Sequence, residues 1–515
     1  MKRTRKLLCL ILCVALCIPF ASALATEQDV IEYTLLLNEH VNQPFADNAL
    51  LFQEIEKRFG VRFNITAVQT DFDTKLELLL ASNQMPDVVE AGSNLTTLLT
   101  NYAWTGAFLD LTDLMETQLP TYYSLYQANP SMAMYNQDGH AYALLKINGD
   151  EAGLCNFGIN LRMDLVEAIG KEMPKTMDEY FDVLVALKEA YPDSIPFSVR
   201  WGGGSIYEDN MACYMFGTGS GMYWEPTLNA WTYGQATEAY KSMLDWHARL
   251  YAAGALDVDY ATTNNQLWQE GCNTGKILSF IQGNWGPDVF QRNLRAAGVE
   301  NALYPEIPVP VNSVTGTARA LKYSNINAWN SLLINADVKE PERLLAALDW
   351  LYTEEGSLIS NWGVEGETFE YDENGNPVYI ESVVKELHDA NPDTYYYDMW
   401  SKIGGGLNGF CMTPVNTTAG RQLRAIAGEE LSDMLDDPNY DTMMIAPSLT
   451  QEESETCADI LNSAKNYCAE YYDAIITGEK PVDEWDNVIA HLYDEIGIQK
   501  VIDIYNAAYL RAMGE

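Results

Sequence analysis

The feature that most constrains this chain is an alternation of strand-like and helix-like segments in residues 31–92. Two short apolar segments, Ile31–Leu37 and Val61–Val68, predict strands. The amphipathic segment Asn48–Phe59 lies between them and predicts a helix. A strand, a helix and a second strand in this order are typical of an α/β unit whose strands pair in parallel.

The alternation continues through Asp71–Gly92. Apolar side chains recur at helical spacing from Leu76 to Leu80, which predicts a second helix. Pro86 prevents this helix from resuming, since the residue before a proline favours extended geometry. The apolar residues after Asp87 then predict a third strand. The whole run therefore predicts a lobe with a mainly parallel sheet.

Polar residues follow the first predicted strand directly. Asn38 and Glu39 stand at its carboxyl end. In open α/β sheets, ligands bind beyond the carboxyl ends of the strands, so both residues are candidate ligand contacts. Ordinary loop polarity explains them equally well at this point.

The N-terminus has the pattern of an export signal. Basic residues at Lys2–Lys6 precede the apolar run Leu7–Phe20, and Ala23–Ala25 forms an A-x-A cleavage site. We therefore expect a signal peptide over residues 1–25 and an exported protein on the outer side of the membrane or in the periplasm. A lipid anchor on Cys17 is the competing interpretation.

Composition excludes several classes of function. The formal net charge is −42, whereas nucleic-acid binding requires a basic surface. The chain contains no GxSxG, HExxH or phosphate-loop motif, and its five histidines are scattered. We therefore predict no catalytic residue, no metal site and no cofactor. Two carboxylates placed across a glycosidic bond would escape this search, because the chain has 73 acidic residues.

Several motifs along the chain resemble one family. They are SNQMPD within residues 82–87, DGHAYA at 138–143, PKTMDE at 174–179, WGVEGETFEY at 362–371 and the C-terminal segment Val482–Met513. The chain resembles the extracellular solute-binding proteins (family 1) of carbohydrate ABC importers, of the long, oligosaccharide-binding type. Many long relatives carry a calcium loop where this chain has only Tyr191–Pro196, so we expect no calcium there.

The resemblance implies an α/β fold of the type II, periplasmic-binding-protein-like kind, with two discontinuous lobes, crossing strands and extra C-terminal helices. The implied N-terminal lobe comprises residues 26–155 and 305–365. The implied C-terminal lobe comprises residues 156–304 and 366–515. The resemblance further implies a monomer whose partners are an oligosaccharide and the permease subunits of an ABC importer.

Exposed tryptophans are the other candidate ligand contacts. A sugar presents apolar C–H faces to flat aromatic rings and hydroxyls to polar side chains. Glycines, polar residues or the family motifs surround five of the 12 tryptophans. The candidates are Trp201, Trp224, Trp285, Trp362 and Trp400, together with Asn284 beside Trp285.

The sequence thus favours a protein that captures an oligosaccharide between two lobes without breaking bonds. A secreted carbohydrate-active hydrolase or lyase is the first alternative. A binder of peptides or other small solutes on the same fold is the second. The identity of the sugar depends on side-chain placement, which the sequence does not give.

Overall fold

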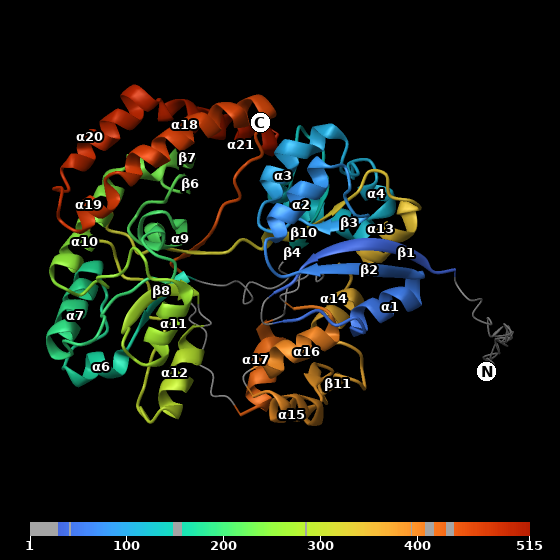
Figure 1. Ribbon diagram of the computed structural model, residues 1–515, viewed down its shortest axis with the longest axis horizontal. Helices are drawn as coiled ribbons and strands as arrows, with labels where there is room; N and C mark the ends of the chain where they lie inside the picture. The colour runs from blue at the N-terminus through green and yellow to red at the C-terminus, as the bar shows by residue number, and fades with distance from the viewer. Residues whose placement is uncertain are drawn as a thin grey trace, which may run out of the picture.

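The computed structural model describes residues 29–40, 43–147, 157–283, 286–392, 394–406, 417–428 and 437–514. Figure 1 shows two bodies side by side, here called the first lobe (on the right) and the second lobe (on the left). The predicted signal peptide with Cys17, and the site candidates Asn284 and Trp285, lie outside the described residues.

A five-stranded sheet forms the centre of the first lobe. Its order is β2-β1-β3-β10-β4, with bounds Val61–Val68, Ile31–Asn38, Val88–Glu90, Ile326–Ile334 and Ala143–Ile147. Strand β1 pairs in parallel with β2 and β3, whereas β10 runs antiparallel to β3 and β4. The leucines at 35–37 are each 1 % exposed, so this sheet is the core of the lobe. The predicted α/β lobe is confirmed, but its sheet is mixed, because two strand pairings are parallel and two are antiparallel.

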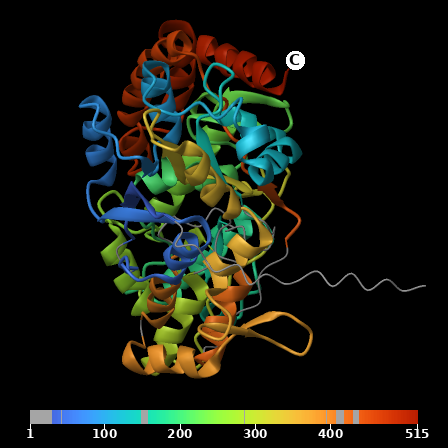
Figure 2. The ribbon, with the colours of Figure 1, turned by 90° about the vertical axis from the view of Figure 1, so that its right-hand side faces the viewer.

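Helices pack around this sheet (Figures 1 and 2). Helix α1 ends at Gly60, whose φ of 61° places it in the left-handed region, where glycine is favoured. The helices of this lobe are α1 Leu50–Phe59, α2 Phe72–Ala81, α3 Leu95–Tyr102, α4 Met115–Gln118, α5 Pro120–Ala128, α13 Pro341–Trp350 and α14 Glu354–Trp362, with 3-10 turns at Ala103–Thr105 and Pro130–Tyr135.

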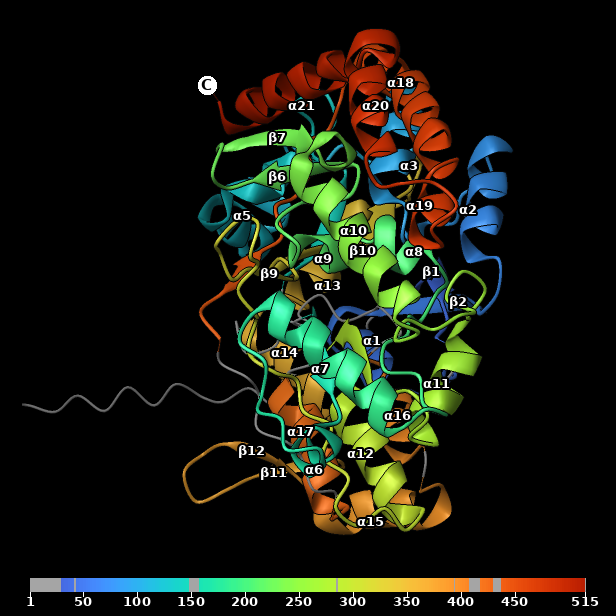
Figure 3. The same ribbon diagram turned by 90° about the vertical axis from the view of Figure 1, so that its left-hand side faces the viewer.

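The second lobe contains three small strand pairs covered by helices (Figure 3). The pairs are β5 Phe157–Leu161 with β8 Ser279–Gly283, β6 Met222–Glu225 with β7 Ala230–Tyr233, and β9 Ala320–Lys322 with β13 Tyr440–Thr442. The helices are α6 Met163–Ala168, α7 Met177–Ala190, α8 Gly204–Tyr207, α9 Asn210–Tyr214, α10 Glu238–Ala252, α11 Asn265–Asn273 and α12 Gly286–Ala296. A 3-10 turn at Gly234–Ala236 precedes α10.

The C-terminal helices belong to the core of the second lobe and also reach the first lobe. They are α18 Gln451–Ala469, α19 Tyr472–Ile476, α20 Glu484–His491 and α21 Ile498–Met513, with a π-helical turn at Leu492–Ile496. A capping box of Thr450 and Glu453 is present at the start of α18. Gln137 Nε2 donates to Leu449 O at 2.9 Å, and Ser448 N donates to Met134 O at 3.0 Å. These two bonds tie the segment just before α18 to the first lobe.

The described parts of residues 366–427 contact the first lobe. They form the hairpin β11 Phe369–Tyr371 and β12 Pro377–Tyr379 and the helices α15 Glu381–Ala390, α16 Tyr395–Ile403 and α17 Thr417–Ile426. Helix α16 packs against α1 and α14, and Gln43 Nε2 donates to Gly405 O at 2.7 Å. The resemblance implies instead that these residues belong to the other lobe. The difference arises because these residues form a small hydrophobic core of their own, and this core lies beside α1.

The chain returns to the first lobe later than the implied boundary at residue 305. Ile307, Val309 and Ala320 pack in the core of the second lobe, and Ile326 is the next residue in the core of the first. The other implied boundary, between residues 155 and 156, lies outside the described residues. In the part of the chain that the structure describes, no helix combines the length and apolarity that crossing a bilayer requires.

Candidate functional site

The carboxyl ends of β1 and β3 carry a polar cluster in the first lobe. Asn38 N donates to Glu90 Oε2 at 2.7 Å, and Asn38 Nδ2 donates to Asn330 Oδ1 at 3.2 Å. Glu39 Oε1 accepts from Phe45 N at 2.7 Å. The structure thus places Asn38 and Glu39 at the predicted edge, where Glu90 and Asn330 join them.

Glu90 is an unusual residue for the end of a buried strand. Its side chain is fully buried, and its Oε1 atom has no hydrogen-bond partner. Burial raises the pKa of Glu90 to about 7, although the nearby ammonium of Lys146 and the backbone N–H of Asn38 act in the opposite direction. A polar atom left without a partner in a protein interior is rare, and carboxyl groups with strongly shifted pKa values concentrate at functional sites.

The segment around α16 lies against this edge. The ring of His40 stacks on Tyr397 with centroids 5.9 Å apart. Trp400 is partly buried against Tyr396 and Tyr397, and its Nε1 has no hydrogen-bond partner. Trp400 is therefore attached to the first lobe near the polar cluster and supported mainly by other aromatic rings.

Three segments of the second lobe end side by side. Residues Ile195 and Phe197 form parallel bridges with Ile277 and Leu256, and β8 follows Ile277 directly. The carboxyl ends of these segments therefore lie at one edge, which is where α/β proteins bind ligands. The side chains at this edge include Arg200, Trp201, Asp257 and Gln282.

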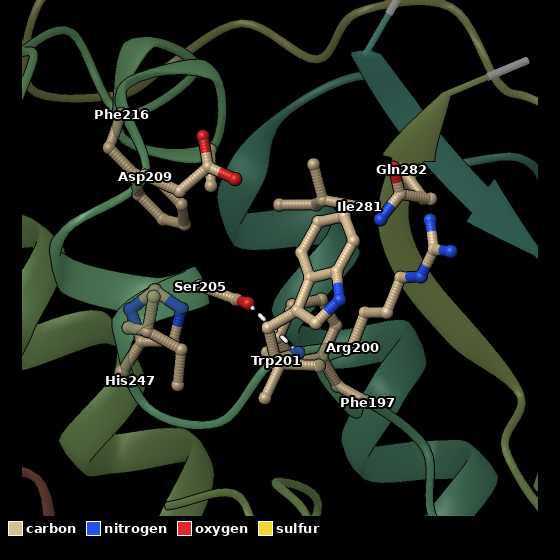
Figure 4. A pocket seen from close by; sticks show the side chains of 12 residues that line it. Phe197, Arg200, Trp201, Ser205, Asp209, Phe216, His247, Ile281 and Gln282 are labelled. Atoms are coloured by element: carbon tan, nitrogen blue, oxygen red, sulfur yellow. Dashed lines mark hydrogen bonds between the residues drawn. The ribbon is translucent and has the colours of Figure 1, made fainter. Parts of the chain in front are cut away.

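Arg200 lies close to two tryptophans at this edge, Trp201 and Trp268, and Figure 4 shows it beside Trp201. Its guanidinium carbon lies 4.3 Å from the ring centroid of Trp201 and 5.4 Å from that of Trp268. Its Nε donates to Asn265 Oδ1 at 2.6 Å. Trp268 is fully buried, whereas Trp201 is 54 % exposed. The cation thus anchors an exposed indole to the core of the lobe, an arrangement that stabilises the ring position.

Gln282 and Trp201 also line a small internal cavity of about 10 Å³ with Asp209 and His247. Burial raises the pKa of the Asp209 carboxyl, which accepts from Met211 N at 2.9 Å. Gly283, the last residue of β8, follows Gln282 at this same edge.

The two remaining tryptophan candidates lie elsewhere. Trp362 is 3 % exposed and packs on Tyr379 with ring centroids 4.7 Å apart, so the expectation of an exposed ring is wrong. Trp224 packs against Trp231 and Tyr509. It lines a pocket of about 300 Å³ together with Asp441, Thr442 and Met443.

Three residues at these edges were not among the sequence candidates: Arg200, Glu90 and Trp329, which precedes Asn330 on β10. Arg200 directly precedes a predicted candidate, so adjacency was an available signal. Glu90 ends an apolar strand, where a carboxylate is unexpected. Trp329 lies in a strand-like segment, and no local sequence signal indicates that its ring is partly exposed rather than part of the core.

Each edge thus combines an aromatic ring with polar side chains, which is the chemistry that sugar recognition requires. Among the residues that the structure describes, no group of His, Cys, Asp and Glu could hold a metal ion.

Comparisons with known proteins agree with this architecture. A family model described as "Bacterial extracellular solute-binding protein" matches residues 43–357. The lipoprotein LipO of Bacillus subtilis is 23 % identical over 343 residues, which is 63 % of this chain and 65 % of LipO. A fructooligosaccharide ABC transporter substrate-binding protein, FusA of Streptococcus pneumoniae, is 30 % identical over 171 residues, 30 % of this chain and 31 % of FusA. The matches thus span less than two thirds of either relative's length.

A solved structure shares the fold over nearly the whole chain. The alginate-binding protein AlgQ2, crystallised without calcium ion, superposes with a TM-score of 0.70 at 20 % identity. The superposition covers 94 % of this chain and 98 % of AlgQ2. The two-lobe fold expected from the sequence is therefore confirmed.

Proposed function

Because this chain belongs to the family of bacterial extracellular solute-binding proteins, we propose that it is the substrate-binding component of an ABC importer and captures an oligosaccharide between its two lobes. One observation carries this proposal: both lobes present aromatic and polar side chains at the carboxyl ends of their strands. Closure of the lobes would bury the ligand, and the permease would recognise the closed form.

The proposal includes an exported, monomeric protein that works with two permease subunits. The export pattern in residues 1–25 supports the location, and a lipid anchor on Cys17 remains the alternative to cleavage after Ala25. The protein would bind without breaking bonds, since the family consists of binding proteins.

A thermal-shift screen tests the proposal. The probes are kestose, an alginate trisaccharide, maltotriose and xylotriose, followed by a mixture of tri- and tetrapeptides. A sugar at 100 times its dissociation constant adds about 2.7 kcal/mol to the free energy of unfolding, which raises the melting temperature measurably. We expect a shift with at least one sugar and recovery of that sugar intact. A sugar recovered cleaved would support the hydrolase or lyase instead, and shifts with peptides alone would change the ligand class.

We expect Trp201→Ala to weaken sugar binding about tenfold, because stacking on an exposed indole contributes on the order of 1.4 kcal/mol. Calorimetric titration with the sugar from the screen measures this loss. Trp104 of the first lobe, an equally large ring that is 66 % exposed, provides the matched control. It comes three residues before Ala107, which bonds to Ala336 beyond the carboxyl end of β10. Trp104→Ala should bind like the wild type. Equal affinities for wild type and Trp201→Ala would remove this ring from the site.

A further inference from the structure

Strand β10 contains an irregularity at the first-lobe edge. From Asn327 to Leu332 it opposes only Lys146 to Leu144 of β4, so β10 accommodates three more residues than its partner. Asn330, within this bulge, has a φ of 54°, a conformation that residues other than glycine seldom adopt. Bulges of this kind re-aim side chains and are frequent next to binding sites.

The bulge is tied to the polar cluster by hydrogen bonds. Asn330 N donates to Gly92 O at 2.9 Å, and Ala91 N donates to Ser331 O at 2.8 Å. The side-chain Nδ2 of Asn38 donates a hydrogen bond to Oδ1 of Asn330. The Nδ2 atom of Asn330 is buried and has no hydrogen-bond partner, like Oε1 of Glu90. Two such atoms beside one bulge are costly to maintain, which indicates that the arrangement serves more than packing.

The next residues of β10 pair regularly with their neighbour strand, which is the arrangement that core packing alone would require. Leu332, Leu333 and Ile334 are fully buried and pair regularly with β3. Because β10 lies between β3 and β4, a bulge there sacrifices ladder bonds on a central strand. The irregularity is confined to the stretch between Asn327 and Leu332, which carries Trp329.

Trp329 is the large side chain that the bulge presents. Its ring is partly exposed, and the ammonium of Lys146 lies 5.4 Å from the ring centroid. This pairing resembles that of Arg200 with Trp201 in the second lobe. Each edge therefore holds an indole whose position a cation stabilises.

We propose that the β10 bulge is a ligand subsite of the first lobe, in which the indole of Trp329 stacks on one sugar ring of the bound oligosaccharide. Asn330 and Asn38 are positioning residues, since they hold the bulge that orients the indole. This subsite rests on the proposed function and adds a stacking residue to it.

The test is calorimetric titration of variants with kestose, the alginate trisaccharide, maltotriose and xylotriose. We expect Trp329→Ala to weaken binding of the responding sugar by about tenfold or more, and Trp329→Phe to lie between that variant and the wild type. Trp104→Ala serves as the control for loss of an exposed indole. Glycine at position 330 tolerates the positive φ, so Asn330→Gly should fold normally. The variant loses the hydrogen bond to Asn38 and should therefore bind the sugar several-fold more weakly. Simple relief of backbone strain would not weaken binding.

The outcomes separate the two proposals. A wild-type protein that binds none of the sugars overturns the proposed function and the subsite together. A wild type that binds a sugar, with Trp201→Ala weakened and Trp329→Phe and Trp329→Ala within twofold of the wild type, overturns the subsite alone. Circular dichroism of each variant confirms that it is folded, and Trp329→Phe keeps the test decisive if Trp329→Ala unfolds.

Discussion

Replacing Arg319 with methionine should destabilise the second lobe by about 3 kcal/mol, since removing one partner of a buried ion pair leaves an uncompensated charge. Arg319 and Glu225 are 9 % and 7 % exposed. Two bonds of 2.9 and 2.8 Å join the guanidinium to the carboxylate, and the guanidinium also lies over the ring of Tyr214. Urea unfolding followed by circular dichroism measures the loss.

The pH dependence of this defect provides a second check. Burial alone would raise the pKa of Glu225, but hydrogen bonds from Arg319 and Thr227 hold it at about 2. A carboxylate with a lowered pKa stabilises the folded state above its unfolded value, and this contribution disappears as the pH falls toward 2. The difference between wild type and Arg319→Met should therefore shrink below pH 4.

Two controls accompany this variant. Glu225→Leu combined with Arg319→Met removes both charges and should recover most of the loss. Lys385→Met breaks an exposed pair with Glu381 and should change stability by less than about 1 kcal/mol. If Arg319→Met unfolds at the same urea concentration as the wild type, the buried pair does not stabilise this lobe.

Acid should destabilise the second lobe through His247. This residue is 2 % exposed among Phe197, Phe216 and Trp246, and its Nδ1 bonds to Met243 O at 2.9 Å. Burial lowers the pKa of His247 to about 4, and the bond to Met243 only partly opposes this. Between pH 6.5 and 4 the unfolded state therefore binds more protons than the folded state, so stability falls as the pH falls.

The expected size is about 2 kcal/mol between pH 8 and pH 5, from the two pKa values of the folded and unfolded states. His247→Phe keeps a ring of similar shape that cannot be protonated. It should be less stable than the wild type at pH 8, because the bond to Met243 is lost, yet lose less stability on acidification. Comparing the two proteins cancels the groups that titrate in both. An identical acid dependence in both proteins would exclude His247 as the cause.

Local sequence determined the elements that depend on neighbouring residues. The alternation in residues 31–92 gives β1, α1, β2, α2 and β3 because hydrophobic periodicity, Gly60 and Pro86 act within a few residues. A turn at Asn374–Gly375 joins β11 and β12, with Gly375 at a φ of 82°, as an Asn-Gly pair in a hairpin favours. Asn38 and Glu39 lie where the strand order predicts, since the ends of parallel strands share one edge.

Only the tertiary structure decided which aromatic rings are exposed and how the edges are built. Trp362 is buried because Tyr379 of the β11–β12 hairpin covers it. Helix α16 docks beside α1, and the following Gly405 contacts Gln43, a residue some 360 positions earlier. Trp329 is presented by a bulge whose register depends on β3 and β4, distant in sequence. Burial and register are set by the partners that folding brings together, and periodicity along one segment carries no information about those partners.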